Sequence, residues 1–464
     1  MNDTQKVMNR GLVVVGAILI QLCLGAIYAW SVFTPRLTKP LADGGEYGFS
    51  AGQAAWIFSI GLATFAVVMV LAGRMQAKVG PRPIAMLGGL VLGAGYVLGG
   101  LVGKTFAAQL TCIGIVGGAG IGLAYVVPIA VGVKWFPDKK GLISGLAVAG
   151  FGFGAVLWVK LAGSWFGGLL NTTNIFGLAG VQSVFVVYGV IFTALVLLGS
   201  IVMVNPPAGF KPAGWEPPAP SAGGQANGAL ELSSGQMLKT PQFYGLWLMF
   251  VGSGLAGLMV IYCIVLFGID SLQAGGAADT AKAAATMGGT AMAFYAVLNG
   301  LGRIVWGLAS DKIGRKAALV LMCAFQGVIM LLFFKMGHTE MGLIIGACII
   351  GFNFGGNFAL FPAATADLFG NRNVGLNYGW VFLAYGVAGI AGPQAAGYFK
   401  DHAAGQVGAW TTPFVIAGVA CLVAAALGIM LRPPKLAIEP KGEAVETAAV
   451  AEADGALETH EAKE

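Results

Sequence analysis

Arg303 lies inside a long apolar stretch of the sequence, eight residues before Asp311. At 1.5 Å per helical residue, this spacing puts Arg303 about 12 Å from the polar end of the stretch. An ionisable side chain there costs about 2.5 to 3.5 kcal/mol or more, which makes it a candidate functional residue. A guanidinium stays charged and matches a carboxylate with two parallel hydrogen bonds, so Arg303 suits a small organic anion. The alternative is a structural role, with the guanidinium donating to helix carbonyls.

Other polar side chains in apolar stretches are weaker candidates. Asn299 lies one helical turn before Arg303 and faces the same way, so it can orient the guanidinium or donate to a ligand. Lys160 lies near the end of another stretch, where its long stem can reach the membrane surface, and we favour a structural role for it. The tyrosines of the apolar stretches could shape a small pocket or simply pack in the core, namely Tyr28, Tyr125, Tyr262 and Tyr385.

The composition places these residues in a membrane. Hydrophobic residues make up 57% of the chain and charged residues 10%, with a mean hydropathy of +0.81. Soluble domains carry about 25% charged residues, so a soluble enzyme is excluded. The basic residues form no stripe, which argues against a nucleic-acid partner. The six cysteines lie in apolar runs without paired spacing, and we find no catalytic motif, so we expect no disulfide, metal, cofactor or enzymatic activity.

Twelve apolar runs are long enough to cross a bilayer as helices, so the sequence predicts an all-α membrane protein. Pairs of small residues such as Gly351-x-x-x-Gly355 predict close packing between these helices. The runs cover residues 11–34, 52–73, 83–103, 106–132, 141–163, 179–204, 242–268, 286–308, 316–336, 340–363, 375–399 and 410–431.

The polar segments divide the chain. A stretch rich in Pro and Gly follows the sixth run, and eight acidic residues mark the C-terminal tail. We expect a six-helix bundle at 1–204, a cytoplasmic linker at 205–240, a second bundle at 241–432 and a disordered acidic tail at 433–464. Eighteen of the 26 Lys and Arg residues fall on one side, which predicts a multi-pass protein of the cell inner membrane with both termini in the cytoplasm.

An internal repeat relates the two bundles. The same offset of 234 residues joins glycine, tyrosine, phenylalanine and proline pairs from the first helix to the fifth. An even number of spans gives the copies a parallel orientation, which places a transport site at the midplane between them. Arg303 falls on Met69 at this offset, so the repeat does not explain the cation. The pairs include Tyr28 and Tyr262, Phe33 and Phe267, Gly73 and Gly307, Gly80 and Gly314, Pro128 and Pro362, Gly145 and Gly379, and Gly152 and Gly386.

The loop from Gly307 to Lys316, with Asp311, Gly314 and Arg315, resembles the loop signature of the major facilitator superfamily. The resemblance implies the twelve-helix major facilitator fold with two pseudo-symmetric six-helix bundles. The first-half copy has Ala77 in place of the signature's Asp. Only Asp311 can therefore pair with a helix N-terminus or a nearby Arg in one conformation and release it in another.

The segments Leu238-Lys-Thr-Pro-Gln-Phe243 and Leu360-Phe-Pro-Ala-Ala-Thr-Ala-Asp-Leu-Phe369 resemble the oxalate/formate antiporter family, which includes bacterial monocarboxylate and lactate carriers. The resemblance spans Gly11 to Leu431 and implies movement of small carboxylates by alternating access. It also implies substrate contacts for Tyr28, Tyr125 and Arg303, and for site aromatics at Phe354 and Phe358. Phe151 and Phe382 would complete an apolar wall.

One departure from that family bears on the substrate. The oxalate carrier has a lysine in its eleventh helix where this chain has Tyr385. A dicarboxylate would lack its second counter-charge here, and a buried uncompensated charge costs several kcal/mol. We therefore expect a monocarboxylate such as lactate, pyruvate, glycolate or formate, and favour lactate-sized molecules with a small apolar group.

The sequence leaves the energy coupling open, and it leaves several alternative functions. No Asp or Glu falls deep in a predicted span, and animal-type carriers have an Asp where this chain has Asn299. Proton symport remains open if the anion itself neutralises Arg303 or enters with its proton, and we favour it over exchange with a counter-carboxylate. The alternatives are an oxalate/formate-type exchanger, a carrier of an uncharged solute, and a non-transporting receptor. We expect a monomer.

Overall fold

The computed structural model describes residues 8–136, 140–175, 177–207, 210–212, 231–370, 373–402 and 406–434. Most of the predicted linker and almost all of the predicted acidic tail lie outside these ranges. The described residues up to Leu431 belong to one compact unit. In the described part of the chain, twelve helices are long and apolar enough to cross a membrane, which confirms the predicted all-α membrane fold.

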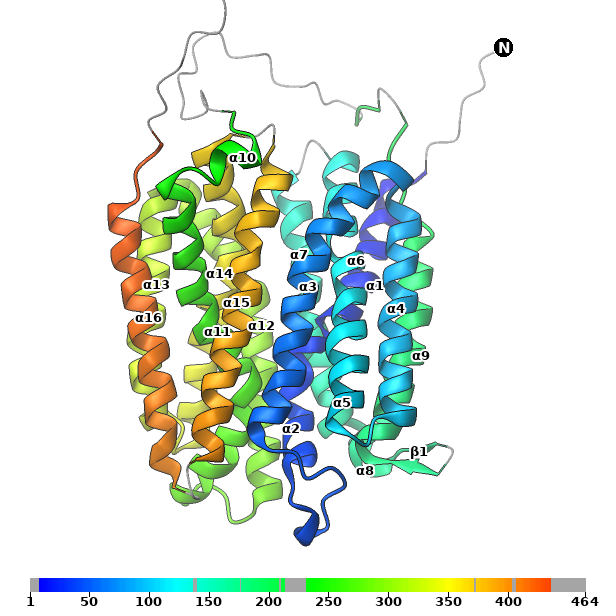
Figure 1. Ribbon diagram of the computed structural model, residues 1–464, viewed down its shortest axis with the longest axis vertical. Coiled ribbons are helices and arrows are strands. Elements are labelled where there is room, and N and C mark those ends of the chain that lie inside the picture. Colours follow the sequence, from blue (N-terminus) through cyan, green and yellow to red (C-terminus); the bar gives the residue numbers. More distant parts are fainter. Residues whose placement is uncertain are drawn as a thin grey trace, which may run out of the picture. The chain divides into compact units, whose positions relative to one another are not determined.

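Figure 1 shows these helices in two groups, with the N-terminal helices in blue to cyan on one side and the C-terminal helices in green to orange on the other. The N-terminal group consists of α1 (Arg10–Leu24), η1 (Gly25–Ala29), α2 (Trp30–Thr38), η2 (Leu41–Asp43), α3 (Ala51–Val79), α4 (Pro81–Val102), α5 (Phe106–Gln109), η3 (Leu110–Gly117), α6 (Gly118–Trp135), α7 (Lys140–Gly163), η4 (Trp165–Gly167), α8 (Leu169–Thr172) and α9 (Gly180–Ser200). A hairpin of β1 (Asn174–Ile175) and β2 (Leu178–Ala179) pairs antiparallel in the register Asn174 to Ala179.

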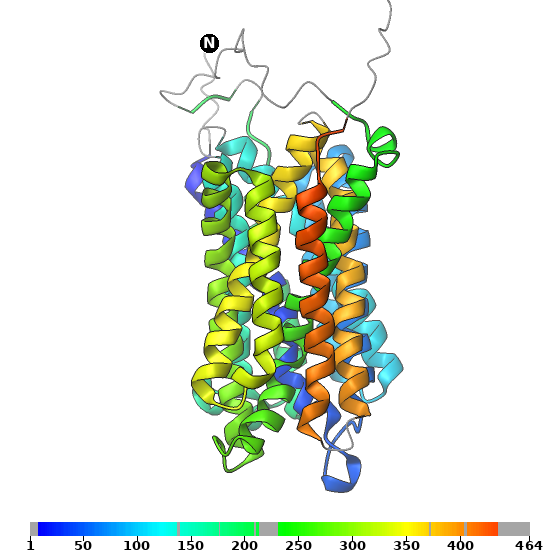
Figure 2. The ribbon, with the colours of Figure 1, turned by 90° about the vertical axis from the view of Figure 1, so that its left-hand side faces the viewer.

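The C-terminal group follows the same plan. Figure 2 looks onto this side, where α13 (yellow-green) and α16 (orange-red) stand next to each other. The short helix α10 lies at the same end of the bundle as the start of α1 and the end of α16 (Figure 1), and we call this the α10 end. The elements are α10 (Ser234–Met237), α11 (Pro241–Ala274), α12 (Ala281–Ile313), α13 (Arg315–Met336), α14 (Glu340–Phe369), α15 (Val374–Asp401), η5 (Val407–Trp410) and α16 (Thr411–Met430).

Several helices extend beyond the predicted apolar runs because polar caps, rather than hydropathy, set their ends. The eighth run was predicted at 286–308, whereas α12 begins after Thr280, whose hydroxyl accepts from the Ala283 amide, and ends at Ile313. A side-chain acceptor at this position satisfies an amide that the helix leaves free. The first run is also interrupted, since it turns into a short 3-10 helix at Gly25–Ala29.

Contacts between the two groups repeat at the 234-residue offset. Gly152 of α7 packs against Ala296 and Gly300 of α12, and Gly386 of α15 packs against Ala63 and Ala66 of α3. Gly152 and Gly386 are partners in the repeat, and so are Ala66 and Gly300. In both places a missing side chain lets two backbones meet closely in an apolar environment. The helix pairs α7–α12 and α3–α15 thus form equivalent halves of the interface on which the site lies.

Candidate functional site

Helix α12 carries Asn299 and Arg303 into the interface because it packs tightly on α14. A β-carbon at Gly351 would collide with the Tyr295 backbone oxygen, and one at Gly355 with that of Asn299. The two glycines therefore form the smooth helix face that their spacing predicted. Arg303 is 3% exposed and Asn299 is fully buried, although both carry strongly polar groups.

The Arg303 guanidinium connects the two groups of helices. Its Nη1 donates to the Val148 carbonyl oxygen of α7 at 2.8 Å. Its Nη2 and Nε donate to Oδ1 of Asn299 at 3.0 and 3.3 Å, so the Asn299 side chain contacts the guanidinium directly. The bond to Val148 matches the structural alternative considered for Arg303. It crosses the interface, so a change at the guanidinium alters a contact between α7 and α12.

Aromatic faces, not carboxylates, surround the Arg303 charge. The guanidinium carbon lies 4.1 Å from the centre of the Phe358 ring and 5.9 Å from that of Phe151. Within the described residues, no Asp or Glu oxygen lies within 4 Å of the guanidinium. Cation–π contacts offset a desolvated charge by about 2 kcal/mol, whereas removing an ion from water costs several kcal/mol. The site therefore favours an added anion.

The predicted aromatic residues all gather beside Arg303. Tyr28 of η1 lies edge-on to Phe151 of α7, with ring centres 5.0 Å apart, and Tyr125 of α6 lies 5.5 Å from the same ring. The break at Gly25 allows this approach, because a β-carbon there would collide with the Phe151 backbone oxygen. Tyr125 also interacts with Arg303. Phe354 and Phe358, both from α14, belong to the same cluster, since Phe354 contacts Tyr28 and Phe358 lies over the guanidinium.

Helix α15 completes the cluster. Phe382 and Tyr385 stack with ring centres 4.9 Å apart, and Tyr385 lies 5.8 Å from Phe358. The Tyr385 and Tyr28 hydroxyl oxygens are 3.0 Å apart. Phe354 lies 5.4 Å from Phe358 and 6.1 Å from Tyr28. All nine predicted residues therefore adjoin one another at the interface.

The cluster also contains Phe65, which no sequence pattern singled out. Phe65 of α3 is 1% exposed, and its ring lies within 6.3 Å of the rings of Tyr125, Phe151, Phe382 and Tyr385. The repeat offset could have identified it, since Phe65 is the partner of Asn299. Tyr262, by contrast, lies outside the cluster, where its hydroxyl donates to the Ala51 carbonyl at the end opposite α10.

The remaining candidates lie away from the cluster. Lys160 donates to Thr290 of α12 at 2.9 Å, so its ammonium binds a protein partner near the end of α7. In the predicted switch loop, Asp311 pairs with Arg315 at 2.5 Å, and Arg315 lies 3.6 Å from Asp367 of α14. Asp311 thus contacts an arginine rather than a helix N-terminus. Gly307 packs near Ala359, Gly314 makes the turn with φ of 87°, and Lys316 is exposed.

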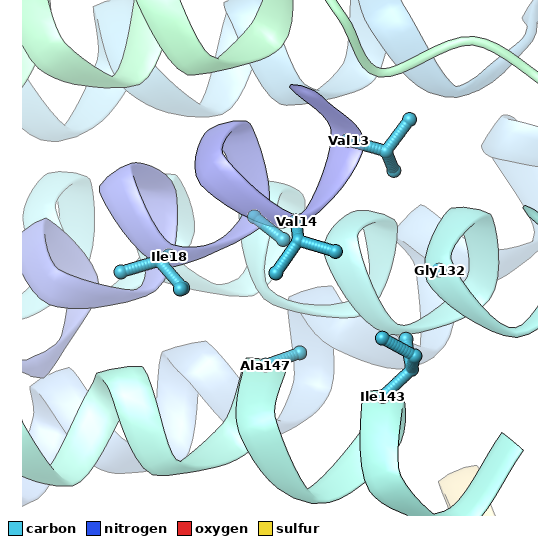
Figure 3. A pocket seen from close by; sticks show the side chains of 7 residues that line it. Val13, Val14, Ile18, Gly132, Ile143 and Ala147 are labelled. Carbon is cyan, nitrogen blue, oxygen red and sulfur yellow. The ribbon is translucent and has the colours of Figure 1, made fainter. Parts of the chain in front are cut away.

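A small hollow between α1, α6 and α7 offers no anion-binding group (Figure 3). Its lining consists of apolar side chains and one glycine, namely Val13, Val14, Ala17, Ile18, Gly132, Ile143 and Ala147. A carboxylate needs donors or a positive charge. The Arg303 cluster is therefore the better candidate for a solute site.

The chain is similar to membrane transport proteins of one family. The family model of the Major Facilitator Superfamily matches residues 21–285 and 276–459. The oxalate:formate antiporter of Oxalobacter formigenes is 28% identical over 448 residues, which cover 93% of this chain and 95% of the antiporter. The apicoplast pyruvate carrier 1 of Toxoplasma gondii is 25% identical over 443 residues, covering 80% of each.

A solved structure shares the fold. The crystal structure of a bacterial homologue of the human lysosomal transporter Spinster, in an inward-facing and unoccupied conformation, aligns with a TM-score of 0.62. The alignment covers 91% of this chain and 96% of that one, at 17% identity. At this identity the likeness supports the fold alone.

Proposed function

This chain belongs to the major facilitator superfamily and is a multi-pass membrane transporter, and we propose that it carries a small monocarboxylate by alternating access. One observation carries the proposal, namely the buried Arg303 cation without a carboxylate partner among the described residues. An Arg fork binds one carboxylate with two hydrogen bonds. The substrates we propose are of the lactate, pyruvate, glycolate or formate class.

The names of the relatives support a carboxylate. One relative is an oxalate:formate antiporter and another a pyruvate carrier, and both align over at least 80% of their length. Within the cluster the site offers one cation and neutral aromatic residues, which fits one negative charge better than two. Oxalate therefore fits less well than a monocarboxylate.

We further propose that Arg303 links substrate binding to the conformational change. Its bond to the Val148 carbonyl holds α12 to α7. A bound carboxylate competes for the same donors and neutralises the charge, which weakens this contact and shifts the balance between conformations. The described acidic residues of the spans lie near helix ends, for example Asp270, Asp367 and Asp401, so none of them is placed to carry a proton through the site. We therefore propose proton symport in which the proton enters together with the substrate.

We place the α10 end in the cytoplasm of a cell whose inner membrane holds the protein, with the residues between the two bundles as a cytoplasmic linker. The basic residues support this orientation, since Lys and Arg are retained on the cytoplasmic side. Residues 1–204 and 241–432 then act as the two moving halves, and the protein works as a monomer.

Uptake of labelled L-lactate into proteoliposomes tests the transport proposal. We expect an inward proton gradient to raise the initial rate several-fold, with no requirement for carboxylate inside the vesicles. A requirement for internal oxalate or formate would replace symport by exchange. No carboxylate uptake in any condition, with the protein folded in the vesicles, would overturn the monocarboxylate proposal.

A contact between the two groups of helices at the end opposite α10 can be removed to test alternating access. Both Asp401 oxygens of α15 accept from the first amides of α3, those of Ala51 and Gly52, at 2.7 Å each. A carboxylate at a helix N-terminus contributes about 1 kcal/mol. This contact joins the two groups of helices, so its loss favours conformations that are open at this end.

Asp401→Ala is therefore expected to raise the population open at the end opposite α10 by about 5-fold. Spin labels on the α2–α3 and α11–α12 loops would report it as a larger share of long distances. Asp270→Asn is the matched control, because Asp270 pairs with Lys400 inside the C-terminal group at 2.5 Å. Equal distance distributions in Asp401→Ala and the unsubstituted protein would contradict this role.

A further inference from the structure

The hydroxyls of Tyr28 and Tyr385 form a hydrogen-bonded pair within the aromatic cluster. Their oxygens lie 3.0 Å apart, and both residues are fully buried. Tyr28 comes from the first span and Tyr385 from the eleventh, so the pair crosses the interface between the two groups of helices. In the described part of the chain, this bond is the single hydrogen bond found for either hydroxyl.

One hydroxyl proton of the pair has no acceptor within the pair. Two hydroxyls carry two protons, and one hydrogen bond between them uses one. The neighbours within ring-contact distance are mainly phenylalanines, which offer no lone pair, namely Phe65, Phe151, Phe354, Phe358 and Phe382. A buried donor without an acceptor is unfavourable. The pair is therefore suited to a ligand oxygen, to which it can donate and from which it can accept.

The hydroxyl pair lies close to the cation. Phe151 contacts the Tyr28 ring at 5.0 Å and faces the Arg303 guanidinium at 5.9 Å. Phe358 contacts the Tyr385 ring at 5.8 Å and faces the guanidinium at 4.1 Å. One layer of aromatic rings thus borders both polar groups. A carboxylate on Arg303 would present the substituents of its neighbouring carbon toward this layer and the pair.

We propose that Tyr28 and Tyr385 form a subsite for the oxygen on carbon 2 of the substrate. The chain then selects 2-hydroxy and 2-oxo monocarboxylates over unsubstituted acids of the same size. A neutral hydroxyl pair matches a neutral hydroxyl or keto oxygen, whereas it leaves a second carboxylate uncompensated. This inference rests on the proposed carriage of monocarboxylates and adds the feature by which the site distinguishes among them.

The selectivity follows from how polar sites reject analogues. A site built to hydrogen-bond a substrate oxygen rejects an analogue that lacks it, because the polar groups are then left without partners. Propionate has the carbon skeleton of lactate without the 2-hydroxyl, which makes it the matched analogue. We expect lactate and pyruvate to bind about 10-fold or more tightly than propionate.

Competition against labelled L-lactate uptake by the full-length protein in proteoliposomes tests the inference. Unlabelled lactate, pyruvate, propionate and acetate serve as competitors. Tyr28→Phe and Tyr385→Phe keep the rings and remove one hydroxyl each. Each substitution is expected to bring the ratio of the lactate affinity to the propionate affinity within about 3-fold of unity. It does so by weakening the binding of lactate while leaving the binding of propionate unchanged.

Tyr295→Phe is the matched control. Tyr295 is fully buried beside Phe354, but its hydroxyl donates to the Gly257 carbonyl at 3.1 Å within the C-terminal group. Its loss is expected to lower the melting temperature without changing the ratio. Where a variant gives too little uptake, the melting-temperature shift produced by each acid in detergent gives the same ratio.

The outcomes separate this inference from the proposed function. Equal competition by propionate and lactate in the unsubstituted protein leaves monocarboxylate transport standing and overturns the subsite. So does a Phe variant that weakens both acids equally. Absence of transport and of stabilisation by any of the four acids overturns both proposals.

Discussion

Replacement of Arg303 by Gln is expected to lower lactate uptake at least about 30-fold. Removing one partner of a buried, hydrogen-bonded ion pair costs about 2 to 5 kcal/mol, and each 1.4 kcal/mol is a factor of ten. The guanidinium is 3% exposed, so water cannot replace it as the carboxylate's partner. Glutamine keeps some polarity but supplies neither the charge nor the fork.

Initial uptake rates over a range of lactate concentrations would measure this effect. Arg303→Lys keeps the charge without the bidentate geometry and should retain part of the activity. Lys160→Gln removes a cation outside the cluster, which binds Thr290, and should leave lactate affinity within about 3-fold. Melting curves would separate misfolding from lost binding. Near-normal lactate uptake by a folded Arg303→Gln protein would contradict the role of Arg303 as the partner of the carboxylate.

Replacement of Tyr385 by Lys is expected to change the substrate preference of the protein from anions with one negative charge to anions with two. The new ammonium would lie in an aromatic site that already contains Arg303, and two like charges there are stable only with two carboxylate groups bound. We expect lactate uptake to fall at least about 10-fold and oxalate to become the stronger competitor.

Binding of oxalate and lactate to the purified protein, followed by melting-temperature shifts, would measure this exchange. Tyr385→Met is the matched control, because it removes the hydroxyl and keeps a long side chain without charge. It should weaken lactate without strengthening oxalate. Stronger oxalate binding by Tyr385→Met would mean that space rather than charge excludes the dicarboxylate, and unchanged selectivity in Tyr385→Lys would place the substrate away from α15.

The cluster around Arg303 shows why part of the site could be predicted. Arg303 and Asn299 stand out locally, since polar side chains are costly in an apolar span and their spacing of four residues puts them on one helix face. Phe65 gives no such local signal, because a phenylalanine in a membrane helix is ordinary, and only its pairing with Asn299 in the repeat points to it. Its ring joins the site only because α3 packs on α15 through Gly386 and on α6 at Tyr125.

The sequence by itself determined the membrane class, the twelve spans, the repeat and the position of Arg303 inside a span, because each depends on hydropathy, charge or spacing along the chain. The tertiary structure decided which side chains meet. The break at Gly25–Ala29 brings Tyr28 against α7, and Tyr28 then meets Tyr385 although 357 residues separate them. The Asp401 contact with α3 arises in the same way. These pairings depend on how the helices pack across the interface, and no local pattern of residues encodes that geometry.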